Sequence, residues 1–160
     1  MEKILGWKAL REEVERHRCR GEKIAFTNGC FDILHVGHVR YLAEARKMGD
    51  LLIVAVNSDA SVRAIKGERR PLVPQQERAE VVASLAAVDY VTLFDETTPL
   101  TLIEYLRPDC LIKGGDWPEE AVVGRKAVRS WGGTVVLIPM VEGASTTNIV
   151  EKILEVYRNG

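Results

Sequence analysis

The chain has 160 residues, of which 46% are hydrophobic, and its formal net charge is −1. This length suits one compact domain over residues 1–160, with an N-terminal helix (1–20) followed by a core (21–160). The near-zero charge lacks the basic footprint of a nucleic-acid binder, and no apolar run is long enough to cross a bilayer. We therefore expect neither a nucleic-acid partner nor a membrane.

The three cysteines, Cys19, Cys30 and Cys110, lie far apart and have no metal-type spacing. They are typical of reduced thiols in a cytosolic protein. The first 20 residues are charged and lack the apolar core of a signal peptide, so we expect a cytoplasmic protein.

Apolar residues alternate along the chain between helical spacing and short aliphatic runs typical of strands covered on both faces. The predicted elements, in chain order, are a helix over 1–20, a strand over 23–27, a helix over 37–48, a strand over 51–56, a helix over 75–87, a strand over 90–94, a helix over 99–106, a strand over 110–113, a helix over 119–130, a strand over 134–138 and a helix over 148–157. This alternation predicts a Rossmann-like, doubly wound α/β fold with a five-stranded parallel sheet. Ligands of such sheets bind at the carboxyl ends of the strands. The long charged segment from Lys66 to Pro74 predicts a functional loop.

The strongest motif directly follows the first predicted strand, where His35 and His38 are separated by Val36 and Gly37. Residues three apart on a helical turn face the same way, so both imidazoles can point into one pocket above the helix start. A helix start favours phosphate, and Gly37 leaves room for a phosphate to approach the backbone. One histidine alone is more often structural, but the pair with its glycine is more specific. Zinc is the weaker interpretation, because no third or fourth ligand has matching spacing.

Such a pair suits phosphoryl or nucleotidyl transfer, which needs positioning and hydrogen-bond donors more than covalent help. The stretch from Asn28 to His38 resembles the HxGH signature of the cytidylyltransferase-like nucleotidyltransferases. The resemblance extends over nearly the whole chain from about Gly21 and is greatest to the D-glycero-D-manno-heptose-1-phosphate adenylyltransferases. Its further segments are 49–59, 66–68, Arg78, 88–91, 113–116 and 142–147. Met140 stands where the cytidylyltransferase branch has an arginine, which favours the heptose branch.

The resemblance implies a role for residues of each segment. His35, His38 and Lys66 would be catalytic, and Lys66 would neutralise charge at the reacting phosphate, with Arg69 and Arg70 as competitors in a mobile basic flap. Asp32, Lys113 and Asp116 would bind the acceptor substrate. The expected nucleotide-binding residues are Asn28, Gly29, Cys30, Phe31, Gly37, His38, Arg78, Gly114, Gly115, Ser145, Thr146 and Thr147.

Simpler interpretations of several of these residues stay open. Ser145, Thr146 and Thr147 precede the last predicted helix and could cap it, although one hydroxyl can cap while the others bind phosphate. The stretch from Lys113 to Asp116 could be only a tight turn, and the segment after Lys66 only a solvated charge run. Arg78 could be an ordinary ion-pair partner, and Asp32 and Asp59 could orient a histidine or a metal-bound water, or cap structure.

The sequence lacks a Walker loop and lacks G-x-G-x-x-G after the first strand, which argues against a Walker ATPase and a redox dinucleotide enzyme. The expected reaction is AMP transfer from ATP to heptose 1-phosphate, giving ADP-heptose for lipopolysaccharide and pyrophosphate. Mg²⁺ is expected to bind through the nucleotide phosphates rather than through a protein metal site. The alternative is a cytidylyltransferase acting on glycerol 3-phosphate, and residue chemistry alone leaves ATP and CTP open. A homodimer is expected by analogy, and a non-catalytic nucleotide-binding module is the alternative class.

Overall fold

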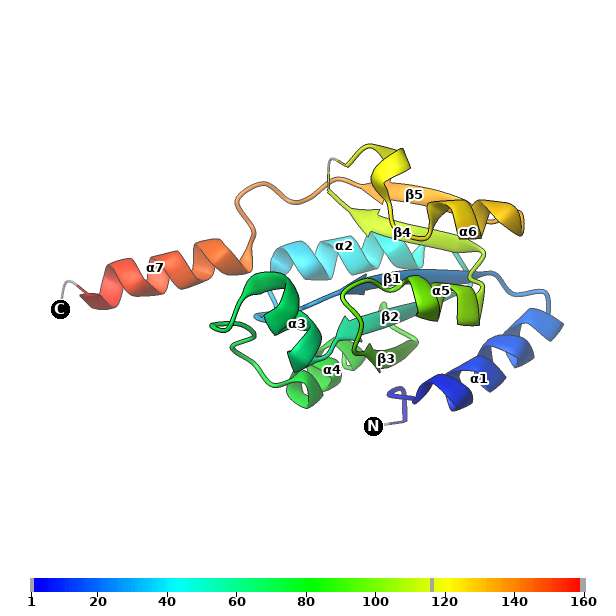
Figure 1. The fold of residues 1–160 in the computed structure, drawn as a ribbon, viewed down its shortest axis with the longest axis horizontal. Coiled ribbons are helices and arrows are strands. Elements are labelled where there is room, and N and C mark those ends of the chain that lie inside the picture. The colour runs from blue at the N-terminus through cyan, green and yellow to red at the C-terminus, as the bar shows by residue number, and fades with distance from the viewer. Residues whose placement is uncertain (1, 116, 159–160) are drawn as a thin grey trace.

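In the computed structural model, which describes residues 2–115 and 117–158, five parallel strands form one sheet in the order β3-β2-β1-β4-β5 (Figure 1). The strands are β1 (Ile24–Gly29), β2 (Leu51–Asn57), β3 (Tyr90–Phe94), β4 (Cys110–Gly114) and β5 (Thr134–Ile138). β1 is central and pairs with both β2 and β4, for example Phe26 with Ile53 and with Leu111. Chain order reverses beside β1, so the switch point of the sheet lies there. The predicted doubly wound α/β fold is confirmed.

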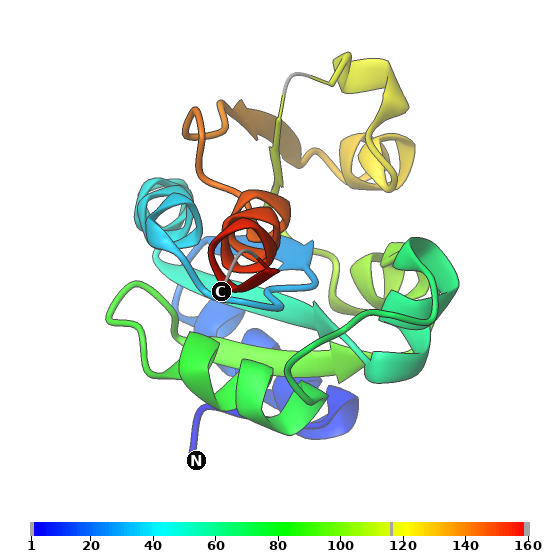
Figure 2. The same ribbon diagram turned by 90° about the vertical axis from the view of Figure 1, so that its left-hand side faces the viewer.

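Helices cover both faces of this sheet (Figures 1 and 2). The helices are α1 (Trp7–Cys19), α2 (Val36–Arg46), α3 (Asp59–Lys66), α4 (Gln75–Ala83), α5 (Leu100–Leu106), α6 (Arg125–Ser130) and α7 (Thr146–Arg158), with a 3-10 turn, η1 (Glu119–Ala121). One apolar cluster joins α2 and α4 to alternate residues of β2, and a second joins α1, α5 and α6 to the others. Every residue of β2 is buried, because helices pack on both of its sides.

The main differences between the predicted elements and the structure concern the helices. α3 was not predicted, since only Ser61 and Val62 of its eight residues are buried and its apolar periodicity is short. The helix predicted over 75–87 ends at Ala83. The helix predicted over 119–130 is broken into η1 and α6, because Gly124 between them has a φ of +90°. A Cβ at Gly124 would lie 2.7 Å from Cδ1 of Ile103, so the break allows α6 to approach α5.

The last helix stands apart from the layers. α7 extends away from the sheet at the end where the strands finish (Figure 1), and none of its residues is buried. No helix of the described residues combines the length and the apolar character required to cross a bilayer. The first turn of α7 reaches back to the loop before α2, where Thr146 bonds to Ile33.

Candidate active site

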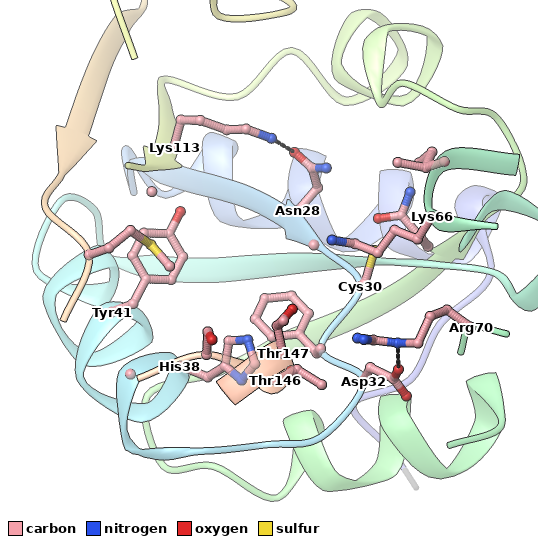
Figure 3. Close-up of a pocket in the computed structure, with 18 of the residues that line it drawn as sticks. Asn28, Cys30, Asp32, His38, Tyr41, Lys66, Arg70, Lys113, Thr146 and Thr147 are labelled. Carbon is pink, nitrogen blue, oxygen red and sulfur yellow. Dashed lines mark hydrogen bonds and ion pairs between the residues drawn. The ribbon is translucent and has the colours of Figure 1, made fainter. Parts of the chain in front are cut away.

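A cavity of about 540 Å³ opens at the carboxyl ends of the strands, where the chain order reverses (Figure 3). That volume suits a small-molecule ligand. Its walls come from the turn after β1, the start of α2, the end of α3, the loops after β3, β4 and β5, and the start of α7. The cavity therefore lies at the end of the sheet where ligands of such folds bind.

The two motif histidines form one unit in the wall of this cavity. His35 is the N-cap of α2, and its Nδ1 accepts a hydrogen bond from the Gly37 N–H at 3.1 Å. His35 and His38 stack, with ring centroids 3.8 Å apart and 27° between their planes. Since Nδ1 of His35 is an acceptor, its neutral ring carries the proton on Nε2 and can donate from there. The predicted convergence of the two imidazoles is thus present.

Burial keeps these rings neutral. Burial lowers the pKa of His38 to about 4, with a smaller contribution from the neighbouring His35, and burial also lowers the pKa of His35. The Nδ1 atom of His38 is buried and has no hydrogen-bond partner among the residues that the structure describes. A polar atom in that state is costly unless a ligand or water satisfies it, so the pair is prepared for a polar ligand.

The turn that leads to the histidines has a constrained backbone. Phe31 adopts a φ of +48°, which is uncommon for a residue other than glycine, and its ring lies 5.1 Å from the His38 ring. A Cβ at Gly29 would come within 2.9 Å of the Phe31 ring. Gly29 thus allows Phe31 to fold under the imidazoles, and both residues line the cavity as expected, together with Asn28 and Cys30.

The start of α7 closes the cavity beside the histidines, as Figure 3 shows for His38, Thr146 and Thr147. Ser145 Oγ accepts a hydrogen bond from the Asn148 N–H at 3.0 Å, so it caps this helix. Thr146 Oγ1 donates to the Ile33 carbonyl at 3.4 Å. The starts of α2 and α7 therefore face one cavity, and both helix dipoles favour an anion there.

The three basic side chains Lys66, Arg69 and Arg70 lie differently with respect to the cavity. Lys66, the last residue of α3, lines the cavity and lies close enough to Cys30 to act on its thiol electrostatically. Arg70 also lines it, but its Nε is bonded to Asp32 at 2.5 Å. Arg69 is exposed and is not among the residues that line the cavity. Of these three cations, Lys66 is therefore the best placed to meet a ligand.

Lys113 supplies a second cation from the end of β4. Its Nζ donates to Asn28 Oδ1 at 3.4 Å, a weak contact, and burial lowers its pKa (Figure 3). Burial likewise raises the pKa of the Cys30 thiol between the two lysines. A half-buried ammonium whose partner among the described residues is an amide favours an anionic ligand.

Asp32, which was expected to bind the acceptor substrate, is instead bonded to other parts of the protein. Its carboxylate is buried and accepts from Arg70 Nε, the Leu72 N–H at 2.8 Å and the Val73 N–H at 2.9 Å. The segment after Lys66, expected to be a mobile flap, is thus tied to the turn after β1. Asp32 reaches the cavity wall with its oxygens already occupied.

Arg78 is the clearest departure from the expected arrangement. It does not line the cavity with the other expected residues: its side chain is 0% exposed and bonds to Val73, Cys30 and Asp59 beneath the wall. Gly115, with a φ of +114°, also lies outside the lining, whereas Gly114 is part of it. Asp116 lies outside the described residues.

Several residues that line the cavity were not among the predicted site residues. They follow strand ends or face them: Tyr41, Asn57, Ile65, Thr97, Thr98, Pro99, Trp117, Val123, Met140 and Ala144. Tyr41 donates or accepts a 2.6 Å hydrogen bond with Thr27, and burial raises its pKa to about 12. Their position at strand ends could have revealed some of these residues. Asn57 ends β2, and Trp117 and Met140 follow β4 and β5 within three residues.

The donors around the cavity do not fit a resident metal ion. Among the described residues, no three His, Cys, Asp or Glu side chains gather as a metal site. The carboxylate in the lining, Asp32, is already occupied by three donors. A divalent ion at this site would need oxygens that a ligand brings.

Comparison with known proteins identifies related sequences. The sequence profile of the Cytidylyltransferase-like family matches residues 26–152. The Bifunctional protein HldE of Syntrophotalea carbinolica is 57% identical over 152 residues, which are 95% of this chain and 31% of that protein. HldE of Geobacter sulfurreducens is 57% identical over 144 residues, 90% of this chain and 29% of that protein. The chain spans about three tenths of the length of these curated relatives.

Solved structures share the fold. The lipopolysaccharide core biosynthesis protein from Thermoplasma volcanium GSS1 has a TM-score of 0.64 and 28% identity, over 78% of this chain and all of that one. The pantoate-beta-alanine ligase from Francisella tularensis has a TM-score of 0.65 at 16% identity, over 97% of this chain and 78% of that one. The second likeness concerns the fold alone.

Proposed function

Because this chain belongs to the cytidylyltransferase-like family of nucleotidyltransferases, we propose that it transfers AMP from ATP to D-glycero-D-manno-heptose 1-phosphate, giving ADP-heptose and pyrophosphate. One observation carries the proposal. A stacked histidine pair, two helix starts and the cations Lys66 and Lys113 meet in one cavity. This arrangement suits the charge of a triphosphate and a sugar phosphate.

The chemistry requires no covalent intermediate. An anionic oxygen of the sugar phosphate attacks the α-phosphorus, a new P–O bond forms, and the bond from the α-phosphorus to the bridging oxygen breaks to release pyrophosphate. That nucleophile is already ionised, so no general base is needed. The protein therefore positions the two phosphates in line and stabilises the charge that develops on the oxygens.

Each residue has a definite part in this proposal. His35 donates from Nε2, and His38, neutral in the free protein, donates from the nitrogen that carries its proton. Lys66 neutralises charge at the reacting phosphate from the end of α3, and Lys113 meets the sugar phosphate from the end of β4. Thr146 and Thr147 at the start of α7 hold the outer phosphates of the nucleotide.

Mg²⁺ belongs to the proposal as a companion of the nucleotide. Carried in with the triphosphate, the ion would supply charge neutralisation on the pyrophosphate leaving group. The described residues offer no ligand set of their own for it, so its affinity should follow that of ATP.

The choice of substrate is supported by the relatives. HldE proteins match over most of this chain, and a protein of lipopolysaccharide core biosynthesis shares its fold at 28% identity. Met140 lines the cavity where an arginine of the cytidylyltransferase branch would stand, with its sulfur 3.1 Å from the Cβ position of Gly114. An apolar side chain there is consistent with a different nucleotide environment from that branch.

Pyrophosphate release tests the function directly. The purified chain with Mg²⁺ would be given ATP or CTP, each with heptose 1-phosphate or glycerol 3-phosphate. Release confined to ATP with heptose 1-phosphate supports the proposal. Release with CTP and glycerol 3-phosphate would replace it by the cytidylyltransferase alternative, and nucleotide binding without release from any pair would favour a binding module.

We also propose that the chain forms a homodimer through α7. This helix contributes no buried residue, and Ile153, Leu154, Val156 and Tyr157 are exposed on it. A second copy would cover these apolar side chains. Sedimentation equilibrium should give twice the chain mass, and a Leu154→Lys variant should sediment as a monomer; a monomeric unmodified chain would contradict the dimer.

A further inference from the structure

Arg78 is the largest fully buried side chain of the described residues and carries a charge, yet it does not line the cavity. A buried guanidinium is costly unless most of its donors are satisfied. Here each of its nitrogens has a partner on a different segment of the cavity wall. Its three bonds therefore define a junction beneath the site.

Two of these bonds hold the ends of one segment. Arg78 Nη2 contacts Asp59 Oδ1 at 2.8 Å, at the first residue of α3, and Arg78 Nε donates to the Val73 carbonyl at 2.8 Å, past the basic loop. Between these two points lie Lys66 and Arg70, which both line the cavity. One guanidinium thus fixes both ends of the segment that carries the basic side chains.

The third bond places that segment relative to the histidine turn. Arg78 Nη1 donates to the Cys30 carbonyl at 2.5 Å, five residues before His35 in the chain. The Val73 N–H, on the other side of the same residue, donates to Asp32 Oδ1 at 2.9 Å. Arg78 and Asp32 therefore hold Val73 from both of its peptide groups and tie the basic segment to the turn after β1.

We propose that Arg78 is a positioning residue for nucleotidyl transfer, which sets Lys66 in register with the His35 and His38 pair without touching the substrate. The inference rests on the proposed function for its reaction. Its physical reason is that a displacement of about 1 Å can cost roughly a hundredfold in rate when reacting groups must be aligned. Lysine cannot replace arginine here, because one ammonium cannot reach three acceptors set in different directions.

Two variants test it, Arg78→Lys and Asp59→Asn. The second removes one ionic partner of Arg78 at the partly exposed edge of the junction and preserves the shape of the side chain. Arg46→Lys is the matched control, because Arg46 also pairs with an aspartate, Asp89 at 2.9 Å, and donates to the Gly49 carbonyl, but remote from the cavity. All rates are expressed per folded molecule. The folded fraction of each variant is measured from its unfolding curve.

Two readouts separate positioning from contact. The first compares the change in kcat with the change in the ATP dissociation constant. The dissociation constant is measured by titration calorimetry without acceptor. The second is the rate at which iodoacetamide alkylates Cys30 in a Cys19→Ser background, since Cys19 is exposed, Cys30 half-buried and Cys110 buried. Cys30 reports on the turn that Arg78 holds, whether or not the enzyme is turning over.

We expect Arg78→Lys to lower kcat by roughly 10- to 100-fold, with the ATP dissociation constant changed less than about threefold. Alkylation of Cys30 should accelerate at least about fivefold because local opening exposes it. Asp59→Asn should also lower kcat and accelerate the alkylation of Cys30, but by smaller factors. Arg46→Lys should change neither rate.

Other results would overturn the inference. A tenfold or greater loss of ATP affinity with an unchanged Cys30 rate would mean that Arg78 contacts phosphate directly. An unchanged kcat per folded molecule would reduce Arg78 to a purely structural role. If the unmodified chain were inactive with every acceptor, the proposed function would fail, and the alkylation rates would still decide whether Arg78 holds the turn.

Discussion

The imidazole of His35 stacks on that of His38 with ring centroids 3.8 Å apart, while its own Nδ1 is used by the Gly37 N–H. The pair is therefore fixed by α2 before any ligand arrives. Among the described residues, the buried Nδ1 atom of His38 has no hydrogen-bond partner, so a polar ligand could satisfy it. Several consequences of this relationship can be measured.

The stability of the free protein should depend on pH through His38. Burial lowers its pKa from 6.5 to about 4, so between these values the unfolded chain binds a proton that the folded chain does not. The free energy of unfolding should therefore fall as the pH drops through this window, and the stabilisation is fully present above pH 6.5. Urea unfolding at pH 7 and pH 5 measures it.

The matched variant for that experiment is His38→Gln, which removes the titrating group and keeps a polar side chain. Carboxylates affect both proteins alike, so the difference between their pH slopes isolates His38. Equal slopes in the two proteins would contradict the lowered pKa.

Turnover should depend on each histidine separately. His35→Ala or His38→Ala should lower kcat by roughly 10²–10³-fold, the usual cost of losing one donor to a transition-state oxygen. Pyrophosphate release from ATP and heptose 1-phosphate is the assay, with circular dichroism to establish folding. A near-normal rate in a well-folded variant would remove that histidine from the mechanism.

Gly37→Ala tests how closely the loop before α7 approaches the histidine pair. A Cβ at this position would lie 2.9 Å from Cε1 and Nδ1 of His35 and 3.0 Å from the Ala144 Cβ. We expect a loss of about 1–3 kcal/mol in unfolding free energy, as for overpacked sites, together with weaker ATP binding. Gly6→Ala is the control, since nothing lies within 4 Å of its Cβ position. Unchanged ATP affinity in Gly37→Ala would show that the approach of this loop is not needed for binding.

Lys66→Ala and Arg69→Ala form a pair that separates a site residue from a neighbouring surface charge. Lys66 lines the cavity, and Arg69 is exposed outside its lining. Loss of Lys66 should lower kcat/KM by roughly 100-fold, comparable with the loss of one electrostatic donor, and loss of Arg69 by less than about threefold. Alanine suits the helix end at Lys66, so the fold should be unaffected. The opposite order of effects would transfer the phosphate role to Arg69.

Much of the fold followed from the sequence because strands and most helices have strong periodicity. β2 is wholly aliphatic apart from its last residue, and its bounds were predicted to within one residue. α3 was missed because it has only eight residues, about two turns, so its apolar pattern is too short to stand out in the sequence. The continuous helix predicted over 119–130 was wrong, since only the packing of α6 on Ile103 reveals why Gly124 must break it.

The site was predictable where chemistry is carried by local motifs. His35, His38, Lys66 and Lys113 line one cavity as their motifs indicated. Arg78 and Asp32 could not be placed in this way, because a sequence does not show whether a charge faces a ligand or a backbone carbonyl. Their partners, Cys30, Val73 and Asp59, are tied to them by tertiary contacts that no local spacing encodes.

The sheet is complete at Ile138, and α7 adds no buried residue to it, yet the first turn of α7 forms part of the cavity. Thr146 reaches the Ile33 carbonyl across 113 positions of sequence. We therefore expect the core to fold independently of the docking of α7 that completes the cavity. A ligand that bridges α2 and α7 would add its own binding free energy to the docking of α7, so saturation with ATP should slow amide hydrogen exchange in α7 far more than in the strands. In this protein the substrate would act as part of the structure that encloses it.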